Sequence, residues 1–140
     1  MKSFWDSSAV INAAISPPVK ARLKQGDHVA RLHVLLEFFS TMTGRGLSYQ
    51  DKAGNPVRIL FAPDDAARWL RGFASKVSLI ELTGPEILDA LDKAQARSIQ
   101  GGRVYDYAHA LAADKVRADE ILTRNAADFQ GLTKAKIIWP

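Results

Sequence analysis

Strand-like and helical segments alternate along almost the whole of this sequence, and that alternation restricts the fold more than any other feature. Short runs of bulky or branched apolar residues, typical of strands, occupy residues 2–5, 28–32, 77–82, 120–123 and 136–139. Apolar residues at helical spacing occupy residues 8–15, 34–43, 63–76, 83–98 and 104–118. Strands and helices that alternate in this way predict an α/β fold with a parallel sheet and helices on both faces.

One segment, Gly46 to Phe61, departs from this alternation. Apolar and polar residues alternate on both sides of the turn-forming run DKAGNP. That pattern is typical of a β-hairpin inserted between two helices. A chain of 140 residues has the usual size of one domain, so we expect a single domain over residues 1–140.

The composition excludes several kinds of site. The sequence has no cysteine, which rules out disulfides and thiolate metal sites. It shows no secretory signal pattern and no apolar run of the ~20 residues that a membrane helix needs, so we expect a soluble cytoplasmic protein without a membrane partner. The net charge of +4 fits a polyanionic ligand but does not by itself indicate one.

The aspartate that ends the first predicted strand, in the stretch FWDSSAVINA, has two interpretations. Asp6 would be a suitable N-cap for the helix that follows, because its side chain accepts hydrogen bonds from a first helical turn. It would also stand at the carboxyl end of a strand, where open α/β sheets place their chemistry. The sequence at this position leaves both interpretations open.

Polar side chains stand out at three further places. Glu37 lies on the polar side of the helical stretch HVLLEFFSTM among short hydroxyl residues, which suits the wall of a cleft. Asp106 lies among small residues in GGRVYDYAHALAADK, in the first turn of a helix whose dipole stabilises a carboxylate. Asn125 and Asp128 follow the last-but-one strand. A solvated helix face or a helix N-terminus would explain each of them equally well when taken alone.

These positions gain meaning from where a doubly wound sheet would put them, because all of them fall near its carboxyl edge. Three or four side-chain oxygens gathered there repel one another unless a cation compensates them. Mg²⁺ binds carboxylate oxygens and water, and it can activate water and neutralise a phosphate. The acidic positions therefore indicate a metal-dependent nuclease.

The order and spacing of FWDSSAVINA, HVLLEFFSTMTG, GGRVYDYAHALAA and ILTRNAADF resemble the PIN-domain family. Within that family, the chain is similar to the VapC-type ribonuclease toxins of bacterial type II toxin–antitoxin pairs, over nearly its whole length. The resemblance implies a PIN-like α/β/α sandwich and an acidic pocket that binds Mg²⁺ or Mn²⁺. It also implies endonucleolytic cleavage of RNA, a homodimer, and a cognate antitoxin that holds the toxin inactive.

The resemblance also implies roles at the positions that match. Asp6 and Asp106 would be direct metal ligands, and Glu37 would be the carboxylate that a helix contributes to the catalytic site. The hydroxyls of Ser7 and Thr123 would hydrogen-bond around the carboxylates.

One position departs from the family pattern. The residue after the Thr-Arg pair is often Asp in the family and is Asn125 here, so either its amide or Asp128 completes the catalytic set. The loss of negative charge motivates an alternative, a non-catalytic RNA-binding or partner-binding PIN domain. A phosphatase of the haloacid-dehalogenase type ranks below both, because it needs a second acid two residues after the first and Ser8 stands there.

Overall fold

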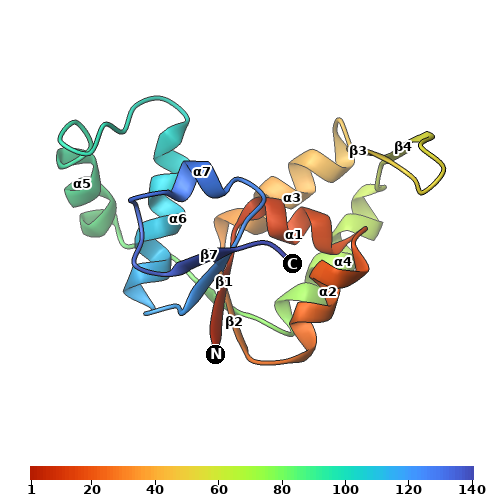
Figure 1. The fold of residues 1–140 in the computed structure, drawn as a ribbon, viewed down its shortest axis with the longest axis horizontal. Coiled ribbons are helices and arrows are strands. Elements are labelled where there is room, and N and C mark those ends of the chain that lie inside the picture. The colour runs from red at the N-terminus through yellow and green to blue at the C-terminus, as the bar shows by residue number, and fades with distance from the viewer.

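Five parallel strands form a central sheet between two layers of helices in the computed structural model, which describes residues 1–140 (Figure 1). The strand order is β5-β2-β1-β6-β7. The strands are β1 (Lys2–Trp5), β2 (Asp27–Arg31), β5 (Ser78–Ile80), β6 (Glu120–Leu122) and β7 (Lys136–Ile138). The predicted α/β class with a central parallel sheet is confirmed.

Successive side chains along each strand point to opposite faces of the sheet, so the core is divided into two apolar clusters, one on each face. Phe4 packs into the first cluster, and its neighbour Trp5 packs into the second. The pair Ile121 and Leu122 divides in the same way on β6. All four side chains are fully buried, which explains why the strands read as nearly continuous apolar runs in the sequence.

Each layer of helices covers one of these clusters (Figure 1). One layer holds α1 (Ser7–Ala13), α2 (Pro17–Ala21), a 3₁₀ turn (Arg22–Lys24), α3 (His33–Thr43) and α4 (Pro63–Ala74). The other layer holds α5 (Gly84–Asp92), α6 (Arg103–Lys115) and α7 (Ala126–Phe129). None of these helices has both the length and the apolar character that crossing a lipid bilayer requires.

The inserted hairpin is confirmed as the antiparallel pair β3 (Leu47–Gln50) and β4 (Pro56–Ile59), which projects beyond the end of α3 (Figure 1). The Gly46 backbone N–H donates to the Thr41 carbonyl at 2.8 Å and so ties the hairpin to the helix. Gly46 has a φ of 76°, and a Cβ there would lie 2.4 Å from the Ile59 carbonyl oxygen. Glycine is therefore required at this turn.

Several expected boundaries are wrong. The helix expected over 83–98 ends at Asp92, and the one expected over 104–118 ends at Lys115. Left-handed backbone at Ser98 (φ 57°) and Arg117 (φ 55°) turns the chain after each helix, and no glycine at those positions signals it. Pro17 and Pro18 follow the end of the first helix, as expected. They also begin α2, because proline is well suited to a first helical turn.

The aromatic contact between α3 and α4 generates a stability prediction. Phe38 is fully buried, and its ring stacks on Trp69 with centroids 4.5 Å apart. We expect Phe38→Ala to lower the free energy of unfolding by about 3–5 kcal/mol, because it removes this contact and leaves a cavity. Leu36→Ala on the same helix, where the side chain is 73% exposed, should change it by no more than about 0.5 kcal/mol. Urea denaturation measures both, and equal midpoints for the two variants would contradict the prediction.

Candidate active site

Asp6 is at once the N-cap of α1 and the residue that follows β1 at the carboxyl edge of the sheet, so it occupies both of the positions expected for it. Its Oδ1 accepts hydrogen bonds from the Ser8 hydroxyl at 2.6 Å and from the backbone N–H groups of Ser8 and Ala9. Its Oδ2 accepts from the Thr123 hydroxyl at 2.6 Å. Burial raises the pKa of Asp6, and these hydrogen bonds act against that rise. The carboxylate is therefore fixed in one orientation.

The structure corrects the role that was expected for Ser7. Its hydroxyl does not bond to a carboxylate but lies 3.5 Å from His109 Nε2, and Ser8 takes the place beside Asp6 instead. Ser8 is the second helical residue, where both its backbone N–H and its hydroxyl reach back to the cap. The Ser8 hydroxyl also accepts from the Arg124 backbone N–H at 3.0 Å, which fastens α1 to the segment after β6.

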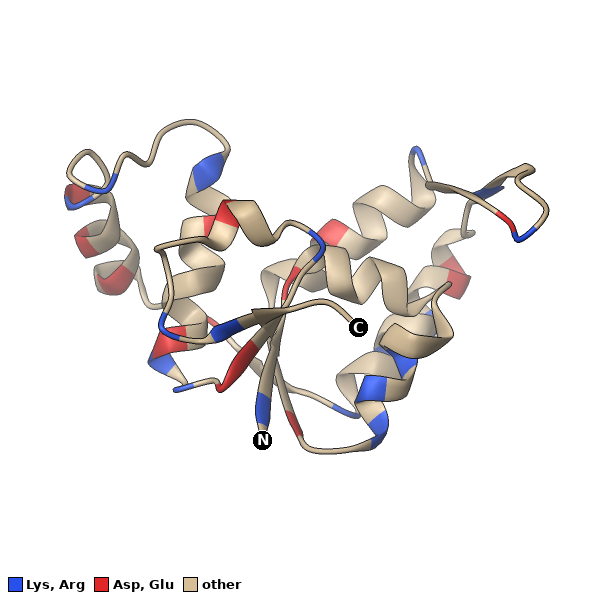
Figure 2. Cartoon of the chain, viewed as in Figure 1, with Lys and Arg blue, Asp and Glu red and all other residues tan.

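Asp106, in the first turn of α6, lies within reach of the charges of three other carboxylates. Burial and then the negative charges of Asp128, Asp6 and Glu37 raise its pKa to about 6, while Arg103 acts in the opposite direction. The four acidic residues come from the end of β1 and from α3, α6 and α7, and those segments surround the carboxyl edge of the sheet (Figure 2). The fold thus places the other three predicted carboxylates where their charges act on Asp106.

Asn125 and Asp128 affect the site in different ways: one through its main chain, the other through its charge. Asn125 is the N-cap residue of α7, but its side chain accepts no hydrogen bond from the first turn. Its backbone N–H donates to the Thr123 hydroxyl at 3.0 Å, so the main chain at this position supports the residue that binds Asp6. Asp128 is exposed, and its charge acts on Asp106. Of the two alternatives, the carboxylate of Asp128 is the one that contributes to the charge of the acidic centre.

Two aromatic residues lie at the site although neither was predicted to belong to it. His33 Nε2 lies 2.5 Å from Glu37 Oε1, one helical turn away on α3. The ring of Tyr105, next to Asp106, stacks on His33 with centroids 5.8 Å apart and planes inclined by 5°. The four-residue spacing of His33 and Glu37 was the available sequence signal, since such residues share a helix face. Tyr105 gave no such signal, because only the packing of α6 against α3 brings it there.

A buried polar cluster lies beneath His33. Arg31 ends β2, is 7% exposed, and donates from Nε to Glu81 Oε1 at 2.8 Å. His109 is 3% exposed, and burial, followed by the charges of Arg31 and His33, lowers its pKa to about 3. His109 is therefore neutral at physiological pH, and it supports the site by packing rather than by carrying a proton.

The donor chemistry of the acidic centre fits a hard divalent cation. Asp6, Asp106 and Asp128 form no ion pair with any basic side chain, so no charge of the chain itself compensates them at contact distance. No three or more His, Asp or Glu side chains form a closed group that could hold a metal ion. Mg²⁺ does not need such a group, because it keeps several waters and often binds through one or two carboxylates. Asp6 and Asp106 are the residues that would hold it.

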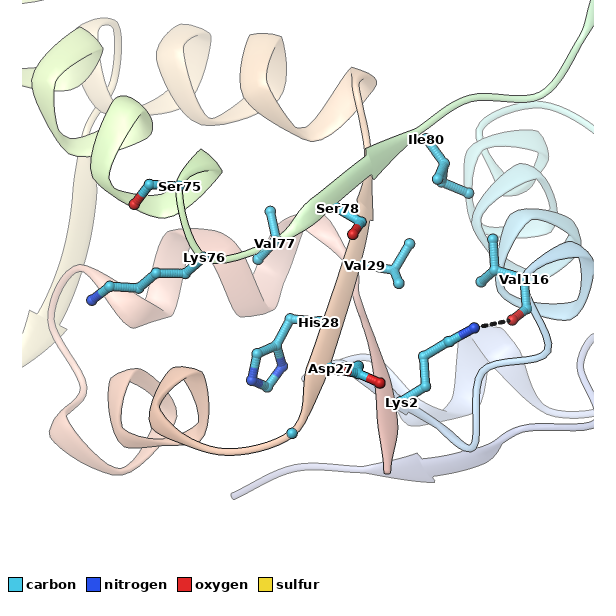
Figure 3. Close-up of a pocket in the computed structure, with 11 residues that line it drawn as sticks. Lys2, Asp27, His28, Val29, Ser75, Lys76, Val77, Ser78, Ile80 and Val116 are labelled. Atoms are coloured by element: carbon cyan, nitrogen blue, oxygen red, sulfur yellow. Dashed lines mark hydrogen bonds between the residues drawn. The ribbon is translucent and has the colours of Figure 1, made fainter.

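The two edges of the sheet each have a hollow, and the two hollows differ in the residues that line them. One open hollow of about 530 Å³ includes Ser8, His33 and Glu37. A second of about 530 Å³ lies at the amino ends of β2 and β5, where Lys2 Nζ donates to the Val116 carbonyl at 2.9 Å (Figure 3). Asp27 is its only carboxylate, and none of the four residues of the acidic centre lines it. The acidic edge is thus the better candidate for catalysis.

The raised pKa of Asp106 generates a pH prediction for the metal-free protein. The folded-state pKa of about 6 lies above the usual 3.8, so the ionised carboxylate destabilises the fold as pH rises between these values and most of all above them. In EDTA at neutral pH we expect Asp106→Asn to raise the free energy of unfolding by roughly 1 kcal/mol after allowance for solvent screening. Near pH 4 the gain should disappear.

Urea denaturation across this pH range measures the effect. Asp92→Asn is the matched control, because Asp92 is exposed on α5 and forms no ion pair. A gain for Asp106→Asn that does not depend on pH would show that the carboxylates do not repel one another as described.

Comparison with known proteins bears on the fold. No protein-family model matches the sequence, and no curated protein matches it significantly. Among solved structures, a chain of the VapBC2 complex from Rickettsia felis bound to a DNA fragment from their promoter is similar, with a TM-score of 0.65 and 13% identity over 100% of this chain and 99% of that one. A chain of a toxin–antitoxin complex from Klebsiella pneumoniae has a TM-score of 0.62 and 16% identity, over 97% of this chain and 95% of that one. A chain of VapBC-1 from nontypeable Haemophilus influenzae has a TM-score of 0.61 and 15% identity, over 99% of this chain and 98% of that one. The predicted resemblance is thus confirmed at the level of the fold: this chain has the PIN-like fold of chains in these three complexes.

Proposed function

We propose that this protein is a Mg²⁺-dependent endoribonuclease and the toxin of a toxin–antitoxin pair. The observation that carries the proposal is the group of Asp106 and three further carboxylates at the carboxyl edge of the sheet. Burial and the charges of those three raise the pKa of Asp106 to about 6. Of the four carboxylates in the group, three have no basic partner within the chain. Such a group is costly to fold unless it binds a cation.

Asp6 and Asp106 would hold the metal, with Mn²⁺ as a substitute for Mg²⁺. When bound, the ion supplies a water of lowered pKa and neutralises charge on the scissile phosphate of an RNA chain. Asp6 is suited to this role because Ser8 and Thr123 fix both of its oxygens. Glu37, held by His33, would accept a proton from the attacking water.

The toxin part of the proposal is supported by the fold. Each of the three similar structures is a complex of a toxin with its antitoxin or carries the VapBC name. A cognate antitoxin is therefore the proposed protein partner of this chain, and a homodimer is its proposed assembly. Inhibition by the antitoxin would occur at the acidic centre, where a basic side chain of the partner would find uncompensated carboxylates.

A non-catalytic RNA-binding or partner-binding PIN domain is the second candidate. Two observations favour it: Asn125 is neutral, and the chain forms no closed group of three metal ligands. The two candidates differ in whether RNA is cleaved, so turnover separates them.

The cleavage assay compares purified wild-type protein with Asp6→Asn and Asp106→Asn on cellular RNA in Mg²⁺, in Mn²⁺ and in EDTA. We expect metal-dependent cleavage by the wild type and a loss of at least about 100-fold in each variant, because each removes a proposed ligand. Asp92→Asn is the control and should cleave at the wild-type rate. RNA that is bound but not cut in either metal would replace this proposal with the second candidate.

Metal binding has a readout that does not require activity. Mn²⁺ at about 100 times its Kd should stabilise the wild-type fold by about 2.7 kcal/mol, because it binds the folded state. Asp106→Asn should lose most of this gain, whereas Asp92→Asn should keep it. Thermal melts with and without Mn²⁺ measure the effect, and equal shifts in the two variants would place the metal elsewhere.

A further inference from the structure

Two adjoining hollows join into a groove that leads away from the acidic centre. The hollow of about 530 Å³ that contains Glu37 continues into one of about 430 Å³ that ends at Leu47 and Ser48 on β3. Ser8, Ile11, Thr41 and Arg45 line both hollows. We call this continuous surface the Arg45 groove. It runs between α1 and α3 from the carboxylates to the inserted hairpin.

Hydroxyl groups and one cation dominate the walls of the Arg45 groove. Ser8, Ser40, Thr41 and Ser48 supply the hydroxyls. Only Ile11 and one leucine are apolar in each hollow. A protein segment that binds tightly needs buried apolar pockets for its anchoring side chains, and this groove is open and mostly polar. A polar, charged backbone is the better match.

Arg45 has the features of a phosphate-binding residue. It is exposed and makes no ion pair, so its guanidinium is free to bind an anion. Its backbone is fixed by the hairpin, because Arg58 Nε donates to the Arg45 carbonyl at 2.7 Å. The Gly46 N–H bond to the Thr41 carbonyl holds the other side of the same turn. The hairpin therefore holds the main chain of Arg45 at the groove.

An acidic centre repels the phosphates on either side of the one that is cleaved, so a nuclease of this kind needs cations nearby. We infer that the RNA flanking the scissile phosphate lies in the Arg45 groove and that Arg45 binds one of its backbone phosphates. This inference rests on the proposed function. It gives the inserted hairpin a purpose, since the hairpin forms the far end of the groove and fixes the main chain of Arg45.

The first test measures binding of a fluorescein-labelled single-stranded oligouridylate by fluorescence anisotropy, in EDTA so that nothing is cut, over a series of salt concentrations. Arg45→Gln should weaken binding about 5- to 10-fold at low salt, and it should flatten the slope of log K against log salt by about 0.7, the value for one phosphate contact on a single strand. Arg71→Gln is the matched control, because Arg71 is an exposed arginine on α4 that lines neither hollow and makes no ion pair.

The second test locates the RNA directly. The chain has no cysteine, so one introduced thiol carries a photo-crosslinker at a single known place. Ser48→Cys at the far end of the groove should crosslink to the oligouridylate. Ser75→Cys, in the hollow at the opposite edge of the sheet (Figure 3), should not.

The outcomes separate this inference from the proposed function. Wild-type protein that neither binds the oligouridylate nor cleaves RNA would overturn both. Wild-type protein that cleaves RNA, with Arg45→Gln equal to Arg71→Gln in affinity and salt slope, would overturn the inference alone. If Arg45→Gln binds RNA normally but loses affinity for the antitoxin, the groove belongs to the protein partner and the inference is wrong.

Discussion

The hydrogen bonds around Asp6 are the interaction on which the rest of the site depends. Its two carboxylate oxygens join the turn between β1 and α1, through Ser8, to the end of β6, through Thr123, which is 117 residues away in the sequence. The same bonds cap α1 and orient the carboxylate at the sheet edge. Because one group does both, structure and proposed chemistry are linked at this residue. Its replacement by Asn keeps a capping side chain but removes the charge.

The repulsion between Asp106 and the other carboxylates at this edge of the sheet is the second constraint on the molecule. The carboxylates of Asp6, Glu37 and Asp128 are held where their charges act on Asp106, by packing of helices that are stable for other reasons, such as the burial of Phe38 and Tyr107. The fold therefore carries an unfavourable charge distribution that hydrophobic burial offsets. A site that is destabilised in the absence of its ligand is common where function needs preorganised charge.

Individual residues show where sequence reasoning succeeded and where it failed. Asp6, Glu37 and Asp106 were predicted to lie together because the order of strands and helices places all three near the carboxyl edge of a doubly wound sheet. The role of Ser7 was carried over from the family resemblance, and the sequence does not say that the Ser8 hydroxyl turns back toward the cap instead. The choice between Asn125 and Asp128 stayed open at the sequence level, since the short helix α7, which sets the position of Asp128, has no strong start signal.

The sequence by itself determined the alternating strands and helices, the inserted hairpin and the positions of the acidic residues, because periodicity and turn residues are local properties of the chain. Only the tertiary structure decided which side chains meet. Tyr105 reaches His33, and Asp128 acts on Asp106, through the packing of separate elements. The Arg45 groove exists because the hairpin is bonded to the end of α3. Such contacts depend on the relative placement of segments far apart in the chain, and no local pattern encodes that placement.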